Sequence, residues 1–186
     1  MGWEPAAAAS DGRTYVWYRQ DKANSCACAS ILMLMYHRQN KKLSEDSVRG
    51  WCGSAEGAVN KSKDGVRDYD TTGTQLDIIG TVLSEKVRLI TSTSSGASAL
   101  RDIKKARPSN PLICGVFWFQ TNTAGDTVWQ GGHAVVAINY HGGKVIFLDP
   151  EYGVFEVPEG DLMNYTITYP GAGGPSTGLI DAVRMP

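Results

Sequence analysis

The hydrophobic pattern of the chain changes near residue 112. Before this point, apolar residues recur at helical spacing, which predicts helices over 26–39, 44–51, 76–83 and 99–103. After it, short β-branched and aromatic runs alternate with turn residues. These runs predict antiparallel strands over 112–119, 133–140, 144–149, 154–158 and 179–185. A helical first half followed by a sheet indicates an α+β fold.

The predicted 26–39 helix is apolar on nearly every side, so we expect it in the middle of the domain. Ser25 is the expected N-cap, which places Cys26 on the first helical turn. Ahead of it, residues 14–18 alternate and predict a short strand. Residues 1–12 are predicted to be a loose tail, residues 13–186 a single domain, and residues 53–73 a long polar loop within it.

Length, charge and cysteine content narrow the class of protein. A chain of 186 residues suits one domain, and its net charge of -1, without a dense basic cluster, argues against nucleic acid as a partner. The first residues lack the basic start and apolar core of a signal peptide, and no apolar run reaches ~20 residues, so we expect a soluble chain without membrane insertion. Its four cysteines are too few for a disulfide scaffold. Free thiols are expected, and a Cys52–Cys114 bridge stays open.

Two cysteines lie at the start of the predicted 26–39 helix. A nucleophilic thiolate needs a lowered pKa, and the first turn of a helix provides it through its dipole and unpaired N–H groups. Cys26 occupies that turn. Cys28 lies about 200° further round the helix and is expected to face the core. Cys26 is therefore the candidate nucleophile, although a lone cysteine there also fits a small buried residue.

A thiol nucleophile needs a base, and the chain has three histidines. His37 lies on the same helix as Cys26 but roughly 16 Å further along, which is too far to reach it. His141 is in a predicted hairpin turn, where an exposed polar residue is expected. His133 begins an apolar strand after two glycines and is the candidate base.

Asp149 and Gln20 are the remaining candidates. Asp149 ends the strand that pairs through the hairpin with the strand that His133 begins. Each lies eight residues from His141 at the turn, so antiparallel pairing brings them close together. Asp149 is the candidate for orienting the imidazole. Gln20 precedes the nucleophile by six residues, and its side-chain N–H is a candidate oxyanion donor beside the backbone N–H of Cys26.

Together these residues resemble the papain-like cysteine peptidase superfamily. The resemblance rests on Gln20 and Cys26, on His133 in GGHAVVAI and on Asp149 in VIFLDPEYG, and it covers 20–36 and 131–153. It is most similar to the bacterial branch, which includes double-glycine leader peptidases and effector or toxin proteases. Ala27 stands where plant and lysosomal members usually carry Trp. We expect neither a pro-segment nor a fused transporter.

The resemblance implies a papain-like fold, with a central buried helix that carries the Cys packed on a C-terminal antiparallel sheet. It implies a thiol endopeptidase that works through an acyl-enzyme and needs no cofactor or metal. The substrate would be a protein or peptide, and an effector or toxin would also have a host target or an immunity protein. Such a protein would be made in the bacterial cytoplasm and secreted or delivered without a signal peptide.

Other interpretations stay open at this point. A thiol amidase, deamidase or acyltransferase would use the same residues, and a non-catalytic interaction module would keep only the shape. Trp118 and Trp129 fit either a substrate groove or the core. Two metal sites are disfavoured: a calcium loop over 68–79 has Ile79 where Glu is required, and a zinc site from Cys26, Cys28, Cys52 and His37 lacks ligand spacing.

Overall fold

The computed structural model describes residues 2–55, 73–74, 76–89, 92–121, 124, 127–164 and 176–184. The helices are α1 (Cys26–Gln39), α2 (Glu45–Ala55), α3 (Leu76–Val87), α4 (Gly96–Ile103) and the short 3-10 helix η1 (Glu159–Asn164). The strands are β1 (Gly2–Ala8), β2 (Thr14–Arg19), β3 (Ser92–Ser95), β4 (Leu112–Thr121), β5 (Thr127–His141), β6 (Lys144–Asp149), β7 (Gly153–Pro158) and β8 (Ser176–Arg184).

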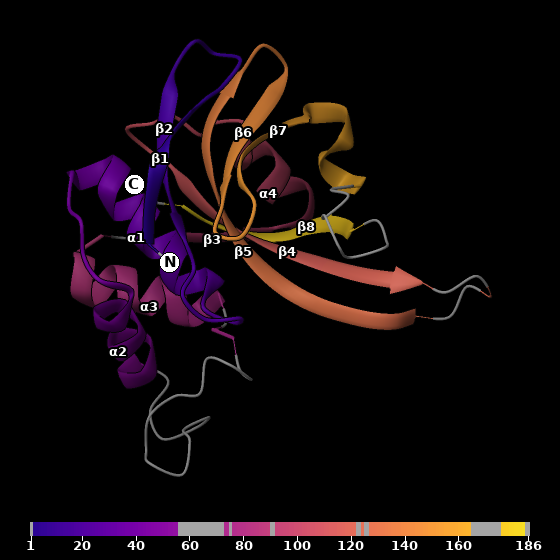
Figure 1. Ribbon diagram of the computed structural model, residues 1–186. Coiled ribbons are helices and arrows are strands. Elements are labelled where there is room, and N and C mark those ends of the chain that lie inside the picture. The colour runs from indigo at the N-terminus through magenta and orange to yellow at the C-terminus, as the bar shows by residue number, and fades with distance from the viewer. Residues whose placement is uncertain are drawn as a thin grey trace.

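The strands form two antiparallel sheets. A six-stranded sheet has the order β3-β8-β4-β5-β6-β7, and β1 pairs with β2 in a separate two-stranded sheet. The predicted meander is confirmed, since β4, β5, β6 and β7 are consecutive neighbours. The predicted last strand is also present, as β8, but it returns to lie between β3 and β4. The fold is therefore α+β, with β5 near the middle of the main sheet (Figure 1).

Both faces of the main sheet are covered by buried side chains. Ile113, Val136 and Leu148 belong to one core together with α1, α2 and α3. Their sequence neighbours Val135 and Phe147 belong to a second core with α4 and η1. In Figure 1, α1, α2 and α3 accordingly lie together on one side of the sheet. Burial on both faces explains why the β5 sequence is apolar without alternation.

Helix α1 is the centre of the larger core, as its sequence predicts. Ten consecutive residues, from Cys26 to Met35, are buried. The hydroxyl of Ser30 donates a hydrogen bond to the carbonyl oxygen of Ala134 on β5, at 3.0 Å. The helix ends at Asn40, which has the left-handed backbone conformation that commonly ends helices. Packing on both sides thus holds the helix directly against β5.

Helix α2 is longer than its sequence predicts. It was expected to end at Trp51 but continues to Ala55, through Gly53. Glycine disfavours a helix interior by only about 1 kcal/mol relative to Ala, and burial of Cys52 and Val48 against α1 outweighs that. The Sγ atom of Cys52 lies 3.7 Å from that of Cys28.

The four cysteines are free thiols, all buried. Cys28 is fully buried, so its expected position in the core is confirmed. Cys52 belongs to the core around α1, whereas Cys114 belongs to the core on the other face of the sheet. The Cys52–Cys114 bridge that the sequence left open is therefore not formed.

The N-terminal residues differ from the expected loose tail. Residues 2–8 form β1, which pairs with β2 and has a register shift between Glu4 and Ala7. The indole of Trp3 contacts the rings of Tyr18 and Tyr36, with centroids 5.2 and 4.9 Å away. Short apolar segments at a chain end give little periodicity, so the sequence did not reveal this pairing.

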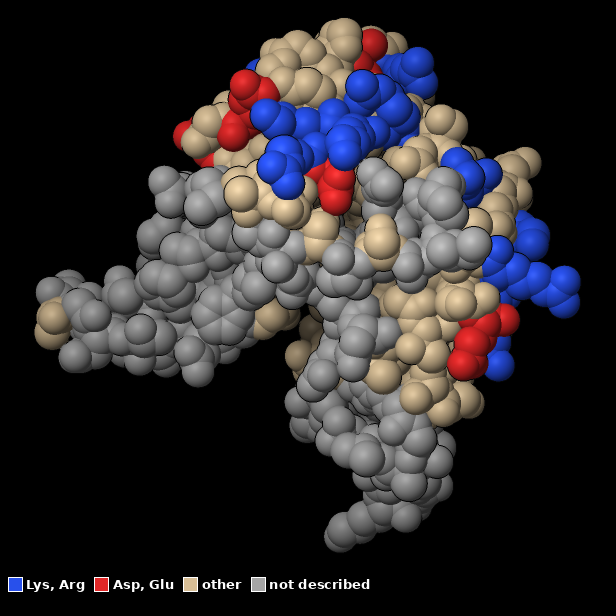
Figure 2. All heavy atoms as spheres, turned by 180° about the vertical axis from the view of Figure 1, so that it is seen from behind, with Lys and Arg blue, Asp and Glu red and all other residues tan. Residues whose placement is uncertain are grey.

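The surface carries charges of both signs. Figure 2 shows Lys and Arg side chains gathered at one end of the face opposite to that of Figure 1, with acidic side chains at their border. Exposed lysines near α4 have acidic partners: Lys105 lies 2.9 Å from Asp102, and Lys104 lies 3.9 Å from Glu159. Within the described residues, no helix has the length and apolar character needed to cross a membrane.

We predict that Trp3→Ala lowers the free energy of unfolding by about 1 to 2 kcal/mol, because Trp3 is only partly buried and a fully buried large apolar side chain contributes about 1.5 to 3 kcal/mol. Denaturant unfolding checks this value. Ala6→Ser, at an exposed position of the same strand, is the matched control and should change stability by less than about 0.5 kcal/mol. Equal stabilities for Trp3→Ala and the parent chain would show that the contacts of the Trp3 ring with Tyr18 and Tyr36 do not stabilise the fold.

Candidate active site

Cys26 is the first residue of α1 and is almost completely buried, with 9% of its surface exposed. The first backbone bond of the helix runs from the N–H of Ala29 to the carbonyl oxygen of Ser25. The thiol is therefore at the positive end of the helix dipole, the position the sequence predicted.

Ser25 occupies the N-cap position, but its side chain does not cap the helix. Its hydroxyl instead donates to the carbonyl oxygen of Lys22 at 3.0 Å and accepts the N–H of Lys22 at 3.1 Å. The expected capping role of the Ser25 side chain is thus wrong, because its hydroxyl is already hydrogen-bonded to Lys22 in the turn before the helix. The positive end of α1 is left to Cys26.

His133 lies within β5, and Asp149 is the last residue of β6. The expectation that His133 begins its strand is wrong, because β5 already starts at Thr127, where it pairs with the end of β4. The Nε2 atom of His133 is 3.1 Å from both Oδ1 and Oδ2 of Asp149. Both side chains are buried, at 5% and 0% exposure. The sequence expectation that the hairpin brings these two residues close together agrees with this geometry.

The register of the hairpin explains how they meet. Val136 pairs with Leu148, so the same register would place Asp149 opposite Val135. His133 lies two residues beyond that position, which makes it a diagonal neighbour on the same face. A bulge between Ala137 and Asn139 shifts the register by one residue. Counting residues from the turn therefore predicts correctly that His133 and Asp149 lie close together. It predicts wrongly that they are directly opposite each other.

His133 also contacts the thiol of Cys26. Burial alone would lower the pKa of His133, but the Asp149 carboxylate and hydrogen bonds to Asp149 and Cys26 raise that pKa well above its ordinary value. Since Nε2 faces Asp149, the other ring nitrogen, Nδ1, is the one left for the thiol. The site therefore favours the protonated form of the His133 imidazole, which lies against the Cys26 thiol.

Asp149 is fixed by the turn that follows it. Its Oδ1 atom accepts the backbone N–H groups of Glu151 and Tyr152, at 2.7 and 3.1 Å. The turn ends at Gly153, whose φ of +91° disfavours any side chain, and a Cβ there would come within 3.3 Å of the Trp17 ring. The PEYG segment thus holds the carboxylate in place against rotation.

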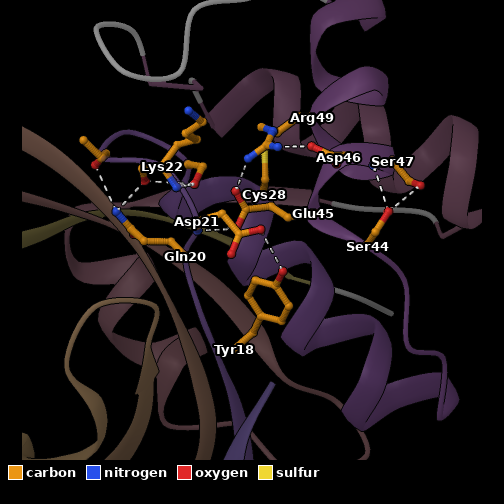
Figure 3. Close-up of polar contacts among 12 residues, drawn as sticks. Tyr18, Gln20, Asp21, Lys22, Cys28, Ser44, Glu45, Asp46, Ser47 and Arg49 are labelled. Atoms are coloured by element: carbon orange, nitrogen blue, oxygen red, sulfur yellow. Dashed lines mark hydrogen bonds and ion pairs between the residues drawn. The ribbon is translucent and has the colours of Figure 1, made fainter. Parts of the chain in front are cut away.

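Gln20 is also buried, but its amide does not face open space. Its Nε2 donates to the carbonyl oxygens of Lys22 and Ala23, at 3.0 and 2.9 Å (Figure 3). Its Oε1 is buried without a hydrogen-bond partner among the described residues. Its backbone N–H donates to the carbonyl oxygen of Pro150 at 2.9 Å, next to Asp149. The main chain thus joins the Gln20 turn to the Asp149 turn.

The other candidate residues do not join this site. The Nε2 atom of His37 is 2.7 Å from the carbonyl oxygen of Val16, and burial lowers the pKa of this histidine. His141 is exposed at the end of β5.

Within the described part of the chain, no group of three or more His, Cys, Asp or Glu side chains has metal-binding geometry. The side chains of Trp118 and Trp129, and residues 68–72 of the calcium-like segment, lie outside the described residues.

Sequence reasoning missed two buried polar residues that brace the site. One is Ser30, through its bond to Ala134. The other is Glu45, whose Oε2 accepts the backbone N–H of Asp21 at 2.9 Å. An acidic residue in the first turn of a helix is ordinary, and so is a serine within one, so neither carried a signal.

Comparison with known proteins places the fold. No protein-family model and no curated protein matches the chain. A solved double-glycine-motif protease from an AMS/PCAT transporter, in complex with a leader peptide, superposes with a TM-score of 0.54 at 17% identity, over 100% of this chain and 94% of that one. The chain thus shares the papain-like α+β fold of that protease.

Two further solved structures are similar over 88% of this chain, both at 14% identity. One is a Bacillus anthracis protein assigned as a C39-like peptidase, with a TM-score of 0.46 over 89% of its own length. The other is the Pseudomonas avirulence protein AvrPphB, with a TM-score of 0.44 over 92% of its length.

We predict that Asp149→Asn lowers the pKa of the His133 imidazole, because the amide removes the negative charge that opposes burial. NMR titration of the ring protons measures this pKa directly. Asp46→Asn is the matched control: its side chain on α2 is 83% exposed, and the pKa of His133 should not change. An unchanged pKa in Asp149→Asn would contradict the electrostatic role of Asp149.

The raised pKa of His133 makes the free energy of unfolding depend on pH. The pKa of His133 is higher in the folded chain than the ordinary value of about 6.5 expected when unfolded. Its protonation therefore stabilises the fold fully below about pH 6.5, and this stabilisation is lost as the pH rises through the folded-state pKa. Denaturant unfolding across this range should show a smaller pH dependence for Asp149→Asn than for the parent chain.

Proposed function

We propose that the chain is a thiol endopeptidase in which Cys26 is the nucleophile, His133 the acid and base, and Asp149 the group that orients the imidazole. The observation that carries the proposal is the His133 ring, which contacts the Cys26 thiol and is bonded through Nε2 to both oxygens of Asp149. Burial, the dipole of α1 and the Asp149 carboxylate all act on the pair formed by Cys26 and His133.

The reaction begins with the proton of the Cys26 thiol held by His133. The thiolate sulfur attacks the carbonyl carbon of a peptide bond, and the carbonyl oxygen becomes an oxyanion. When the C–N bond breaks, His133 gives its proton to the leaving amine, and an acyl-enzyme remains on Cys26. A water molecule, deprotonated by His133, then attacks the thioester, the acyl group leaves as a carboxylic acid, and the thiolate of Cys26 beside a protonated His133 is restored.

The oxyanion needs N–H donors near Cys26. The backbone N–H of Cys26 is one candidate, because the first N–H groups of a helix have no partner within the helix. Gln20 is the other, and its amide would have to leave the carbonyls of Lys22 and Ala23 when substrate binds. Its buried Oε1 favours such a rearrangement, since an unsatisfied buried acceptor costs about 1 to 3 kcal/mol.

The proposed substrate is a peptide or an extended protein segment. Support comes from the shared fold, because the double-glycine-motif protease with this fold was solved with a leader peptide bound. We also propose that the chain acts as a bacterial effector or toxin protease, with a host target or an immunity protein as partner. This part rests on the resemblance of the Gln20, Cys26, His133 and Asp149 segments to the bacterial branch.

We predict that Cys26→Ala lowers kcat for peptide hydrolysis by about 10⁴-fold or more, as removal of a catalytic nucleophile does. Cys28→Ala is the matched control, because it removes a thiol two residues away that faces Cys52 and not His133. It should retain activity within a few fold. Iodoacetamide at neutral pH should label Cys26 first, and preferential labelling of Cys28 would refute the assignment.

Mass spectrometry of protein and cell-wall substrates separates peptide hydrolysis from related chemistry. New peptide ends are expected. A gain of about one dalton at glutamine side chains would identify a deamidase, and a new acyl linkage would identify a transferase, because all three use the same acyl-enzyme. Identical cellular effects of the parent chain and Cys26→Ala would instead identify a non-catalytic interaction module.

A further inference from the structure

Glu45, the first residue of α2, is a buried carboxylate that contacts the turn before Cys26. Its side chain is 0% exposed. Its Oε2 accepts the backbone N–H of Asp21 at 2.9 Å, and its carboxylate is also in hydrogen-bond contact with the Ser25 hydroxyl, whose single proton it shares with the carbonyl oxygen of Lys22. Figure 3 shows Glu45 beside Asp21, on the side of the turn opposite to Gln20. The carboxylate thus holds both ends of a five-residue segment.

The two candidate oxyanion donors, Gln20 and Cys26, flank that segment. Asp21 follows Gln20 directly, and Ser25 precedes Cys26 directly. Within the turn, the carbonyl oxygen of Lys22 accepts the Gln20 amide, the hydroxyl of Ser25 and the backbone N–H of Ser25. A shift of Asp21 or Ser25 therefore moves the Gln20 amide relative to the N–H of Cys26.

The carboxylate is compensated from its own helix. Arg49, one turn further along α2, donates to Glu45 Oε1 at 2.7 Å. Arg49 also pairs with Asp46, whose side chain is exposed. Burial raises the pKa of Glu45, while the hydrogen bonds from Ser25 and the Asp21 N–H oppose this. If the Glu45 carboxylate moved, the groups that donate to it would lose their buried acceptor, which is costly. The position of the carboxylate and the position of the turn therefore depend on one another.

We infer that Glu45 is a positioning residue that fixes the Gln20–Ser25 turn so that the two oxyanion donors converge on the carbonyl attacked by Cys26. This inference rests on the proposed function and adds a residue to it. Glu45 touches neither Cys26 nor His133 in the contacts described. Its effect is therefore on the stabilisation of the oxyanion and not on the formation of the thiolate.

This distinction gives a test with two reactions. Peptide hydrolysis passes through an oxyanion. Alkylation of Cys26 by iodoacetamide does not, because the sulfur–carbon bond forms as iodide leaves, and the thiol proton stays on His133. We predict that Glu45→Ala lowers kcat for peptide hydrolysis by about 10- to 100-fold with little change in KM. The alkylation rate of Cys26 should stay within about threefold of the parent rate.

Three further variants complete the experiment. Glu45→Gln keeps an acceptor oxygen for the Asp21 N–H and should retain most of the activity. Glu45→Asp keeps the charge beside Arg49 but withdraws the carboxylate, so it should show the same selective loss as Glu45→Ala and replaces it if the alanine variant does not fold. Asp46→Ala removes the exposed partner of Arg49 and should be within about twofold of the parent in both reactions.

The outcomes separate the two proposals. Equal losses in hydrolysis and alkylation, or no loss in either, would overturn the role of Glu45 while the parent chain still hydrolyses peptide. A parent chain that neither hydrolyses peptide nor alkylates selectively at Cys26 would overturn the peptidase proposal and this inference with it. A loss in Glu45→Gln equal to that in Glu45→Ala would show that charge matters, and not the acceptor to the turn.

Discussion

The packing of α1 against β5 is the constraint on which the site depends. Ten consecutive buried residues leave this helix no freedom to rotate or slide, and the Ser30 hydroxyl ties it to the main chain at Ala134. Cys26 lies at the start of the helix, and His133 directly precedes Ala134. The thiol and the imidazole are thus placed by two regular elements, and a closely packed core transmits little displacement to either. A site built in this way needs no loop closure to bring its two central groups together.

Electrostatics at the site follow from the same burial. An isolated histidine in this position would be neutral, since removal from water disfavours its charge. The Asp149 carboxylate reverses that preference, and it can do so because two backbone N–H groups of the following turn already hold it. Buried ion pairs stabilise a structure only when their remaining lone pairs are satisfied. The turn after β6 is therefore as much a part of the imidazole's environment as the carboxylate itself.

Much of this could be predicted from the sequence, because periodicity and chain spacing are local. The buried α1, the β4–β7 meander and the proximity of His133 to Asp149 follow from such patterns. What could not be predicted depends on packing between distant segments. The bulge in β5, the pairing of β1 and the use of the Ser25 hydroxyl within its turn all have weak local signals. Glu45 is the clearest case, since only the packing of α2 against the 20–25 turn distinguishes it from any acidic residue at a helix start.

The bond from the Gln20 N–H to the Pro150 carbonyl oxygen joins the two turns of the site through main-chain atoms alone. Every residue has a carbonyl oxygen, and every residue except proline has an N–H, so this link depends on almost no particular side chain. Sequence drift at either position would leave the spacing between the turns intact, and proline at position 20 is the replacement that would break it. A main-chain tie of this kind allows the surroundings of a site to diverge widely in composition while its geometry persists.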